Sequence, residues 1–337
     1  MSSKSTKPNI YTVAERAGVS HQTVSRVIND HPSLRPETRA RVLAAMEELG
    51  YVPNQAARAL VTSKSGLIGI LATDTVLYGP AGMLHAIEVG ARNAGYVAIA
   101  CSVDGESKQA VRKGLEHLRH LGVEGLIVIT PQSHSLDIAH EVMRHLPVVA
   151  IDNTYRMGEL SASIDSYAGA TQATQHLIDL GHRKIVHITG PATYFEAAAR
   201  SAAYTAAMLA AGLTPRIIDG DWDIETGHRL GHEIDFLGRG ITAVFAANDH
   251  LALGLLKACR ERGISVPRQV SVVGFDDIPE AGYFVPALTT VRQDFTAAGA
   301  RAVDLLVRAL AGEGHLESET VTPVFIERES TGPAPTV

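Results

Sequence analysis

Residues 10–29, IYTVAERAGVSHQTVSRVIN, have the pattern of two short helices joined by a tight turn. Small apolar residues recur at helical spacing until Gly18, and glycine closes many helices because it adopts the left-handed conformation without strain. Ser20 follows as an expected helix N-cap, and a second helix is expected over residues 21–28. The segment is therefore predicted to be a helix-turn-helix.

The outward polar side chains of this segment suit DNA. Glutamine can pair with adenine and arginine can pair with guanine in the major groove, while hydroxyls and helix N-terminal amides suit phosphate. An ordinary helical hairpin with a solvated polar face is the alternative that periodicity alone leaves open. The predicted DNA-contacting residues of the segment are Thr12, Ser20, His21, Gln22, Thr23, Ser25, Arg26 and Asn29.

The sequence of residues 14–30, AERAGVSHQTVSRVIND, resembles the headpiece of the LacI/GalR family of bacterial repressors. A third helix is expected over residues 36–49, because Pro36 stands where a first helical residue is favoured and Gly50 ends the pattern. This helix is expected to turn Val42, Leu43, Met46 and Leu49 towards the first two helices.

Residues 54–64 form a short, alanine-rich segment after the predicted third helix. From composition alone the segment is a plain linker. The resemblance implies instead a hinge helix that forms on operator DNA, with Leu60 inserted into the minor groove and Asn54 and Ala57 nearby. This role is physically coherent, because so short a helix is unstable alone and an apolar wedge can kink DNA.

The charge is distributed unevenly along the 337 residues. The net charge is −6, but residues 1–61 carry eight Lys or Arg and five Asp or Glu, which leaves +3 there and −9 on the remainder. A basic head on an acidic body is expected if only the head touches phosphate. The N-terminus lacks the apolar region of a signal peptide, and no apolar run has membrane-spanning length, so we expect a cytoplasmic protein without a membrane partner.

From Leu67 onwards, apolar β-branched runs of strand length alternate with helical patterns. This alternation predicts parallel sheets with helical crossovers. The resemblance implies a periplasmic-binding-protein-like α/β core of two lobes, each with a mainly parallel sheet, behind the helical headpiece. The expected domains are a headpiece at 1–53, a hinge at 54–64, an N-terminal lobe at 65–164 with 292–323, and a C-terminal lobe at 165–291 with 324–337.

Polar residues at strand ends predict where a ligand binds, because ligands of open α/β sheets bind at the carboxyl ends of strands. Asp152, the pair Asn248-Asp249 and the pair Asp276-Asp277 occupy such positions, although each is also a possible helix N-cap. Trp222 is either a packing residue or a face for a sugar ring. The resemblance implies an effector pocket for a neutral sugar, made of Asp152, Arg200, Trp222, Asn248, Asp276 and Gln293.

Three other interpretations compete with that of a sugar-released repressor. An enzyme is disfavoured because the sequence holds no phosphate-binding glycine loop, nucleophile elbow or HExxH motif. A sugar-binding receptor without a DNA role would leave residues 10–60 unused, and a corepressor-dependent regulator of the same family stays open. We expect operator DNA and a sugar as partners, no cofactor or metal, and a homodimer, because the chain shows no leucine heptad tail.

Overall fold

The computed structural model describes residues 8–28, 34–52, 64–73, 75–130, 133–151 and 160–335. The chain divides into two compact units, residues 1–66 and residues 67–337. Within the described ranges, no helix combines the length and the apolar composition that crossing a membrane requires.

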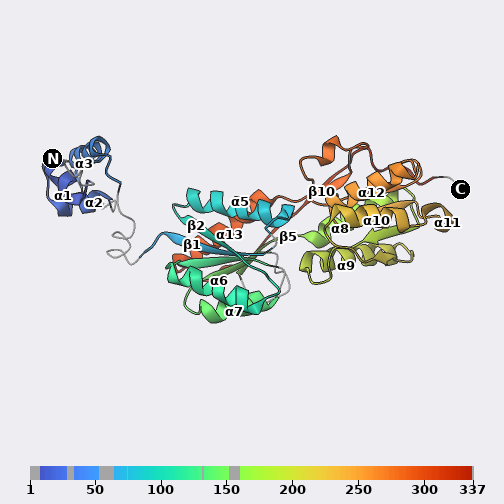
Figure 1. The fold of residues 1–337 in the computed structure, drawn as a ribbon, viewed down its shortest axis with the longest axis horizontal. Helices are drawn as coiled ribbons and strands as arrows, with labels where there is room; N and C mark the ends of the chain where they lie inside the picture. The colour runs from blue at the N-terminus through green and yellow to red at the C-terminus, as the bar shows by residue number, and fades with distance from the viewer. Residues whose placement is uncertain are drawn as a thin grey trace, which may run out of the picture. The chain divides into compact units, whose positions relative to one another are not determined.

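The described residues of the first unit form a bundle of three helices (Figure 1). Its helices are α1 (Ile10–Ala17), α2 (His21–Ile28) and α3 (Pro36–Leu49). Gly18 has φ +63° at the end of α1, as the predicted turn requires. The buried core of the unit consists of small side chains from all three helices: Val13, Ala14, Ala17, Val24, Val27, Val42 and Ala45.

The prediction that Leu43 faces the other two helices is wrong, since half of its surface is exposed. Val42 is fully buried. Leu43, the next residue, lies about 100° further around the helix and is therefore turned away from the core. Ala45 is the next buried residue of α3. The two smaller side chains thus allow α3 to pack closely against α1.

The second unit contains a six-stranded parallel sheet whose strands lie in the order β2-β1-β3-β4-β5-β11. These strands are β1 (Leu67–Ala72), β2 (Val97–Ser102), β3 (Gly125–Ile129), β4 (Val148–Ile151), β5 (Leu160–Ile164) and β11 (Glu319–Val321).

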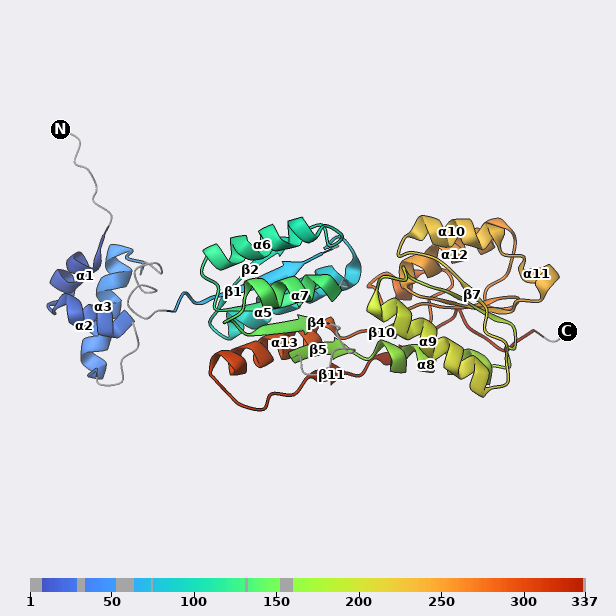
Figure 2. The same ribbon diagram turned by 90° about the horizontal axis from the view of Figure 1, so that it is seen from below.

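Helices cover both faces of this sheet (Figures 1 and 2). Ile68 and Ile70 of β1 share one apolar core with two helices, while Leu71 belongs to the core on the opposite face. Burial on both faces explains why the strands are continuous apolar runs. The first pair of helices is α5 (Tyr78–Asn93) and α13 (Phe295–Leu310), and the second pair is α6 (Lys108–His120) and α7 (Ser133–Val142).

A four-stranded parallel sheet lies in the order β7-β6-β8-β9. Its strands are β6 (Ile185–Ile188), β7 (Ile217–Ile218), β8 (Ala243–Ala246) and β9 (Ser271–Val273). One face shares a core with α8 (Ser166–Asp179) and α9 (Phe195–Ala210), and the other shares a core with α10 (Ile224–Glu233) and α12 (Asp249–Glu261). A short helix, α11 (Phe236–Arg239), and a 3-10 turn, η1 (Ala281–Tyr283), complete this part.

The final segment forms two short strands that join different sheets. β11 joins the six-stranded sheet beside β5, whereas β12 (Val324–Ile326) pairs antiparallel with β10 (Thr290–Arg292). Pro323 lies between them, and proline interrupts a strand because it has no backbone N–H to donate. The lobe boundaries remain a prediction, because residues 67–337 form one compact unit.

Candidate functional site

The second helix of the first unit presents a polar surface. Val24 and Val27 of α2 are buried, whereas His21, Gln22 and Arg26 are exposed. The ring of His21 lies 5.2 Å from the exposed ring of Tyr11, measured between centroids. The sequence therefore places amide, guanidinium and imidazole groups together on the side of α2 that faces away from the core.

The hydroxyl residues near this surface cap the helices. Ser20 Oγ accepts a hydrogen bond from the Thr23 amide at 3.2 Å, which is the predicted N-cap of α2. Thr12 Oγ1 accepts from the Asn9 amide at 2.8 Å, while Asn9 Oδ1 accepts from the Thr12 amide at 3.1 Å. This reciprocal capping box was missed because its usual signature has glutamate or glutamine at the third helical position, where this helix has Thr12. Ser25 is half-buried on the same helix.

Several predicted site residues lie outside the described residues. They are Asn29, Asn54, Ala57 and Leu60 of the predicted DNA-contacting set, and Asp152 of the predicted effector pocket.

The second unit contains a cavity of about 330 Å³ at the carboxyl ends of strands from both parallel sheets. Thr73 follows β1 and Thr130 follows β3, which is the neighbouring strand. The chain continues from β1 to β2 on one side of this pair and from β3 to β4 on the other side. Asn248 follows β8 at the equivalent point of the four-stranded sheet. Such switch points are where open α/β sheets bind ligands. Five predicted pocket residues line the cavity: Arg200, Trp222, Asn248, Asp276 and Gln293.

A buried guanidinium and a buried carboxylate lie at the base of the cavity. Arg200 Nη1 donates to the Ala247 carbonyl at 2.6 Å, and its guanidinium carbon lies 3.9 Å from the centroid of the Phe275 ring. Arg200 Nη2 lies 3.9 Å from Asp276 Oδ1, which accepts a hydrogen bond from Gln293 Nε2 at 2.6 Å. Neighbouring elements therefore fix all three side chains before any ligand binds.

Two carboxyl groups of the cavity, those of Asp276 and Glu196, are harder to ionise than usual. Burial raises the pKa of Asp276 to about 6, although Arg200 and Gln293 oppose this rise. Burial also raises the pKa of Glu196, and Arg200 again acts in the opposite direction. The cavity thus places two carboxyl groups around one guanidinium and has no surplus of positive charge among these three groups.

Trp222 stands edge-on to an aromatic neighbour and directly over a glycine. Its ring centroid lies 5.5 Å from that of Tyr194, with an interplanar angle of 80°. A Cβ atom at Gly190 would lie only 2.3–2.5 Å from three atoms of the indole, so only glycine leaves room for the ring. Asn248 Nδ2 donates to the Trp222 carbonyl at 3.1 Å and ties this loop to the start of α12.

The remaining strand-end acids have structural roles. Asp249 is fully buried and accepts hydrogen bonds from the Ile278 amide and the Thr290 hydroxyl. Asp277 forms ion pairs with Arg292 and Arg328, each at 2.7 Å. Asn248 is both a helix N-cap and a cavity residue, because its Oδ1 accepts from the Leu251 amide at 2.8 Å. The N-cap alternative and the pocket prediction therefore do not exclude each other.

Sequence reasoning missed much of the aromatic and acidic lining of the cavity. One available signal was Glu196, which lies one helical turn before Arg200 and therefore on the same face of α9. The others gave no periodic signal. The missed residues of this kind are Tyr78, Tyr194, Phe195, Glu196, Asp223 and Phe295.

Two protein-family profiles match the chain. The profile described as "Bacterial regulatory proteins, lacI family" matches residues 9–54, which include α1 to α3. The profile described as "Periplasmic binding protein-like domain" matches residues 174–331, which include the four-stranded sheet. The matches assign a DNA-binding headpiece and a ligand-binding-protein fold to one chain.

Characterised relatives align along almost the full length. The lactose operon repressor of Escherichia coli (strain K12) is 32% identical over 330 residues, covering 97% of this chain and 91% of that protein. The transcriptional repressor PurR of Serratia proteamaculans (strain 568) is 35% identical over 334 residues, covering 97% of both chains.

Solved structures agree with this alignment. The Lac repressor dimer bound to operator and the anti-inducer ONPF has a TM-score of 0.87 at 30% identity, covering 97% of this chain and 100% of that chain. A complex of the transcriptional regulator CelR with cellobiose has a TM-score of 0.71 at 29% identity, covering 96% and 99%.

These relatives overturn two of the rival interpretations. The interpretations of the chain as an enzyme and as a sugar receptor without a DNA role are both wrong, because the headpiece and the core together match DNA-binding regulators over 97% of the chain. The chain, with its helical headpiece and its core of two parallel sheets, belongs to the LacI family of DNA-binding transcriptional repressors.

Proposed function

We propose that this repressor controls carbohydrate-utilisation genes and leaves its operator when a neutral sugar binds in the cavity of the second unit. The observation that carries this proposal is the group Arg200, Asp276 and Gln293, held beside Asn248 and the face of Trp222. Carboxyl, amide and guanidinium groups serve sugar hydroxyls, because each hydroxyl both donates and accepts a hydrogen bond. An indole face suits the apolar side of a sugar ring.

The size and charge of the cavity support a small neutral ligand. A volume of about 330 Å³ is near the lower end of the range for small-molecule sites, roughly 300–1,000 Å³. A phosphorylated sugar would bring a second negative group close to Asp276 and Glu196, with Arg200 as the one guanidinium among the described residues that line the cavity. A monosaccharide or a small glycoside avoids this repulsion.

A purine corepressor is the second candidate. The aromatic residues Tyr78, Tyr194, Phe195 and Phe295 line the cavity together with Trp222, and aromatic rings suit a flat base. PurR proteins are also as similar to this chain as the lactose operon repressor is. The two candidates predict opposite effects on DNA binding, since a corepressor tightens it and an inducer weakens it.

Operator binding measured with each class of ligand separates these candidates. Duplexes selected by the purified protein from a random pool supply the operator probe, and fluorescence anisotropy reports its affinity. A neutral sugar should weaken binding about 5- to 150-fold, the range of typical allosteric coupling. Tighter binding with hypoxanthine or guanine, and no effect of any sugar, would replace the proposal with the corepressor. Asp276→Ala should remove the response to the sugar and leave operator affinity in its absence intact.

We further propose that the protein acts in the cytoplasm as a homodimer, with α2 of each subunit in one major groove of a pseudo-palindromic operator. Arg26→Ala should cost about 1–3 kcal/mol at one base position. Comparing the sequences that the variant and the native protein select measures this effect. An equal loss of affinity for every sequence would limit Arg26 to phosphate contact.

A further inference from the structure

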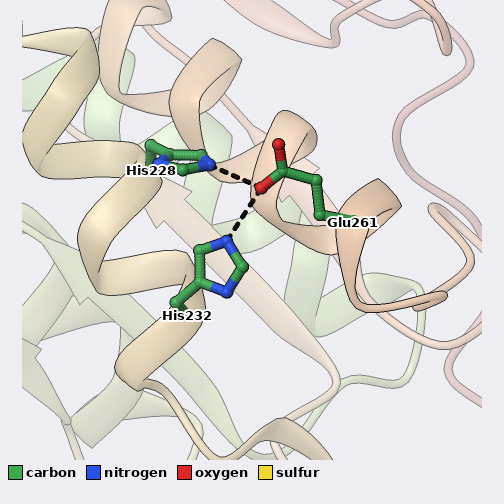
Figure 3. Close-up of side chains that lie close together, drawn as sticks. All are labelled: His228, His232 and Glu261. Atoms are coloured by element: carbon green, nitrogen blue, oxygen red, sulfur yellow. Dashed lines mark hydrogen bonds and ion pairs between the residues drawn. The ribbon is translucent and has the colours of Figure 1, made fainter.

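Away from the cavity, two histidines and a glutamate converge on the outer side of the α10–α12 pair. Figure 3 shows the imidazoles of His228 and His232, one turn apart on α10, directed at the same carboxylate of Glu261 on α12. His228 Nε2 lies 2.6 Å from Glu261 Oε2, and His232 Nε2 lies 2.9 Å from the same oxygen. Three potential metal donors from two helices therefore surround one point.

The sequence builds a rigid base for this cluster. Gly227 and Gly231 directly precede the two histidines, and added Cβ atoms would lie 2.1 Å from the Leu251 carbonyl oxygen and 2.6 Å from Ala258 Cβ of α12. An added Cβ at Gly254 would likewise lie 2.0 Å from the Ile224 carbonyl oxygen. The repeated glycine-histidine pair thus brings the helix backbones close together, so the histidines sit beside α12 without a flexible connection.

We propose that His228, His232 and Glu261 form a binding site for Zn²⁺, which would join the second half of α10 to the last residue of α12. Two imidazole nitrogens and one carboxylate oxygen are a known donor set for zinc, with water as the fourth ligand. Each of the three side chains is more than a third exposed, which lets an ion enter and keep a water molecule. The proposal departs from the sequence-based expectation that the protein has no metal.

The distances fit zinc after a small displacement. Tetrahedral zinc with bonds of about 2.0–2.2 Å separates neighbouring ligand atoms by roughly 3.3 Å. The nitrogen–oxygen separations of 2.6 and 2.9 Å must therefore widen by about 0.7 and 0.4 Å, which exposed side chains permit. Each histidine binds the ion in the neutral tautomer that carries its proton on Nδ1 and presents the Nε2 lone pair.

Lys257 provides an internal competitor for the site. Its ammonium forms an ion pair with Glu261 Oε1, one turn earlier on α12. Bound zinc and the ammonium would share one carboxylate, so Lys257 should weaken zinc binding. Removing the ammonium of Lys257 is therefore expected to raise the affinity of the site for zinc. Zinc bound to other groups of the surface would not show this effect.

Isothermal titration of the full-length protein with zinc chloride, after treatment with a chelator and its removal, tests the proposal. The native protein should bind one zinc ion per chain, and His228→Ala or His232→Ala should weaken binding at least tenfold, since loss of even an outer-shell partner costs about 10- to 100-fold. Lys257→Ala should bind more tightly than the native protein. His117→Ala removes an exposed histidine of α6 and is the matched control, with unchanged binding.

Two results would overturn the zinc site. One is no heat of binding in the native protein at millimolar zinc. The other is native affinity in the double variant His228→Ala/His232→Ala, which would place the ion elsewhere. Circular dichroism checks that each variant folds. Should a histidine variant fail to fold, Glu261→Gln supplies the same comparison, because it removes the charge and keeps the hydrogen-bond acceptor.

Discussion

At the scale of single residues, the position of Trp222 depends on the absence of a side chain at Gly190. The indole fills the space that any Cβ at that position would occupy. The guanidinium carbon of Arg200 and the ring centroid of Tyr194 each lie 5.5 Å from the centroid of the indole. One face of the cavity is thus set by a contact between two loops that follow β6 and β7. The sequence indicated the tryptophan but not the glycine beneath it.

Gly190→Ala should displace the indole and reduce ligand affinity about tenfold or more, because the added methyl overlaps the ring. Trp222 is the single tryptophan of the chain, so its own fluorescence spectrum reports the displacement. Gly314→Ala is the control, since an added Cβ there meets nothing within 4 Å. An unchanged spectrum in Gly190→Ala would mean that the backbone, rather than the ring, gives way.

Asp276 makes the stability of the second unit depend on pH. Burial raises its pKa from 3.8 to about 6, so folding favours the protonated form. The stability associated with this group is present below pH 3.8 and is lost as the pH rises through 6. The charged side chain therefore destabilises the free protein at neutral pH, a cost that a ligand hydroxyl could reduce by donating a hydrogen bond.

Asp276→Asn should remove this dependence. Between pH 4 and pH 7 the free energy of unfolding of the variant should rise relative to the native protein by about 2 kcal/mol, which is most of the free energy equivalent to a shift of roughly two pKa units. Urea unfolding at several pH values, followed by circular dichroism, measures the difference. A difference that stays constant over this range would show that Asp276 ionises as readily as in the unfolded chain.

At the scale of elements, the turn between α1 and α2 rests on backbone conformation alone. Gly18 has φ +63°, and a Cβ there would meet no other atom within 4 Å. Gly18→Ala should therefore destabilise the first unit by about 1 kcal/mol through left-handed strain. Gly18→Asn should cost less, because asparagine tolerates this conformation.

The melting temperature of the headpiece, followed together with operator affinity, measures both variants. Equal stability of the native protein and Gly18→Ala would mean that the turn relaxes into another conformation. The effect should be measurable because so small a core leaves little stability in reserve.

The elements that the sequence predicted were those with strong local signals. The first two helices, their glycine stop and their serine cap follow from adjacent residues, and the apolar runs of β1, β3 and β8 are buried on both faces. Local signals also indicated Asn248, Asp276 and Trp222 as pocket candidates, since strand ends and the lone tryptophan are visible in the sequence, whereas Arg200 and Gln293 were implied only by the family resemblance.

The elements that the sequence did not predict depend on distant partners. β5 contains Ser161 and Ser163, which weaken its apolar pattern, and both are buried. The Ser161 amide donates to Ser318 Oγ, and Ser163 Oγ lies 3.1 Å from Thr320 Oγ1, across 157 positions of the chain. Likewise, nothing near residues 319–326 indicates that β11 and β12 join different sheets.

At the scale of the whole molecule, the two compact units have cores of very different size. Among the described residues, the unit 1–66 contains one cluster of small buried side chains, whereas the unit 67–337 contains four apolar clusters on the faces of two sheets. The first unit should therefore unfold at a lower temperature than the second. Operator DNA should stabilise the first unit, and a sugar should stabilise the second.

Calorimetry of the full chain should accordingly show two transitions. Val24→Ala, in the core of the first unit, should reduce the free energy of unfolding of that unit alone by about 2 kcal/mol and lower the temperature of the first transition. Val244→Ala on β8 should lower the temperature of the second transition alone. A sugar at a hundred times its dissociation constant should add about 2.7 kcal/mol to the second unit. Because coupling is reciprocal, operator DNA should reduce this gain. A single transition that both variants lower equally would show that the units unfold together, and a gain unaffected by DNA would separate the cavity from control of the operator.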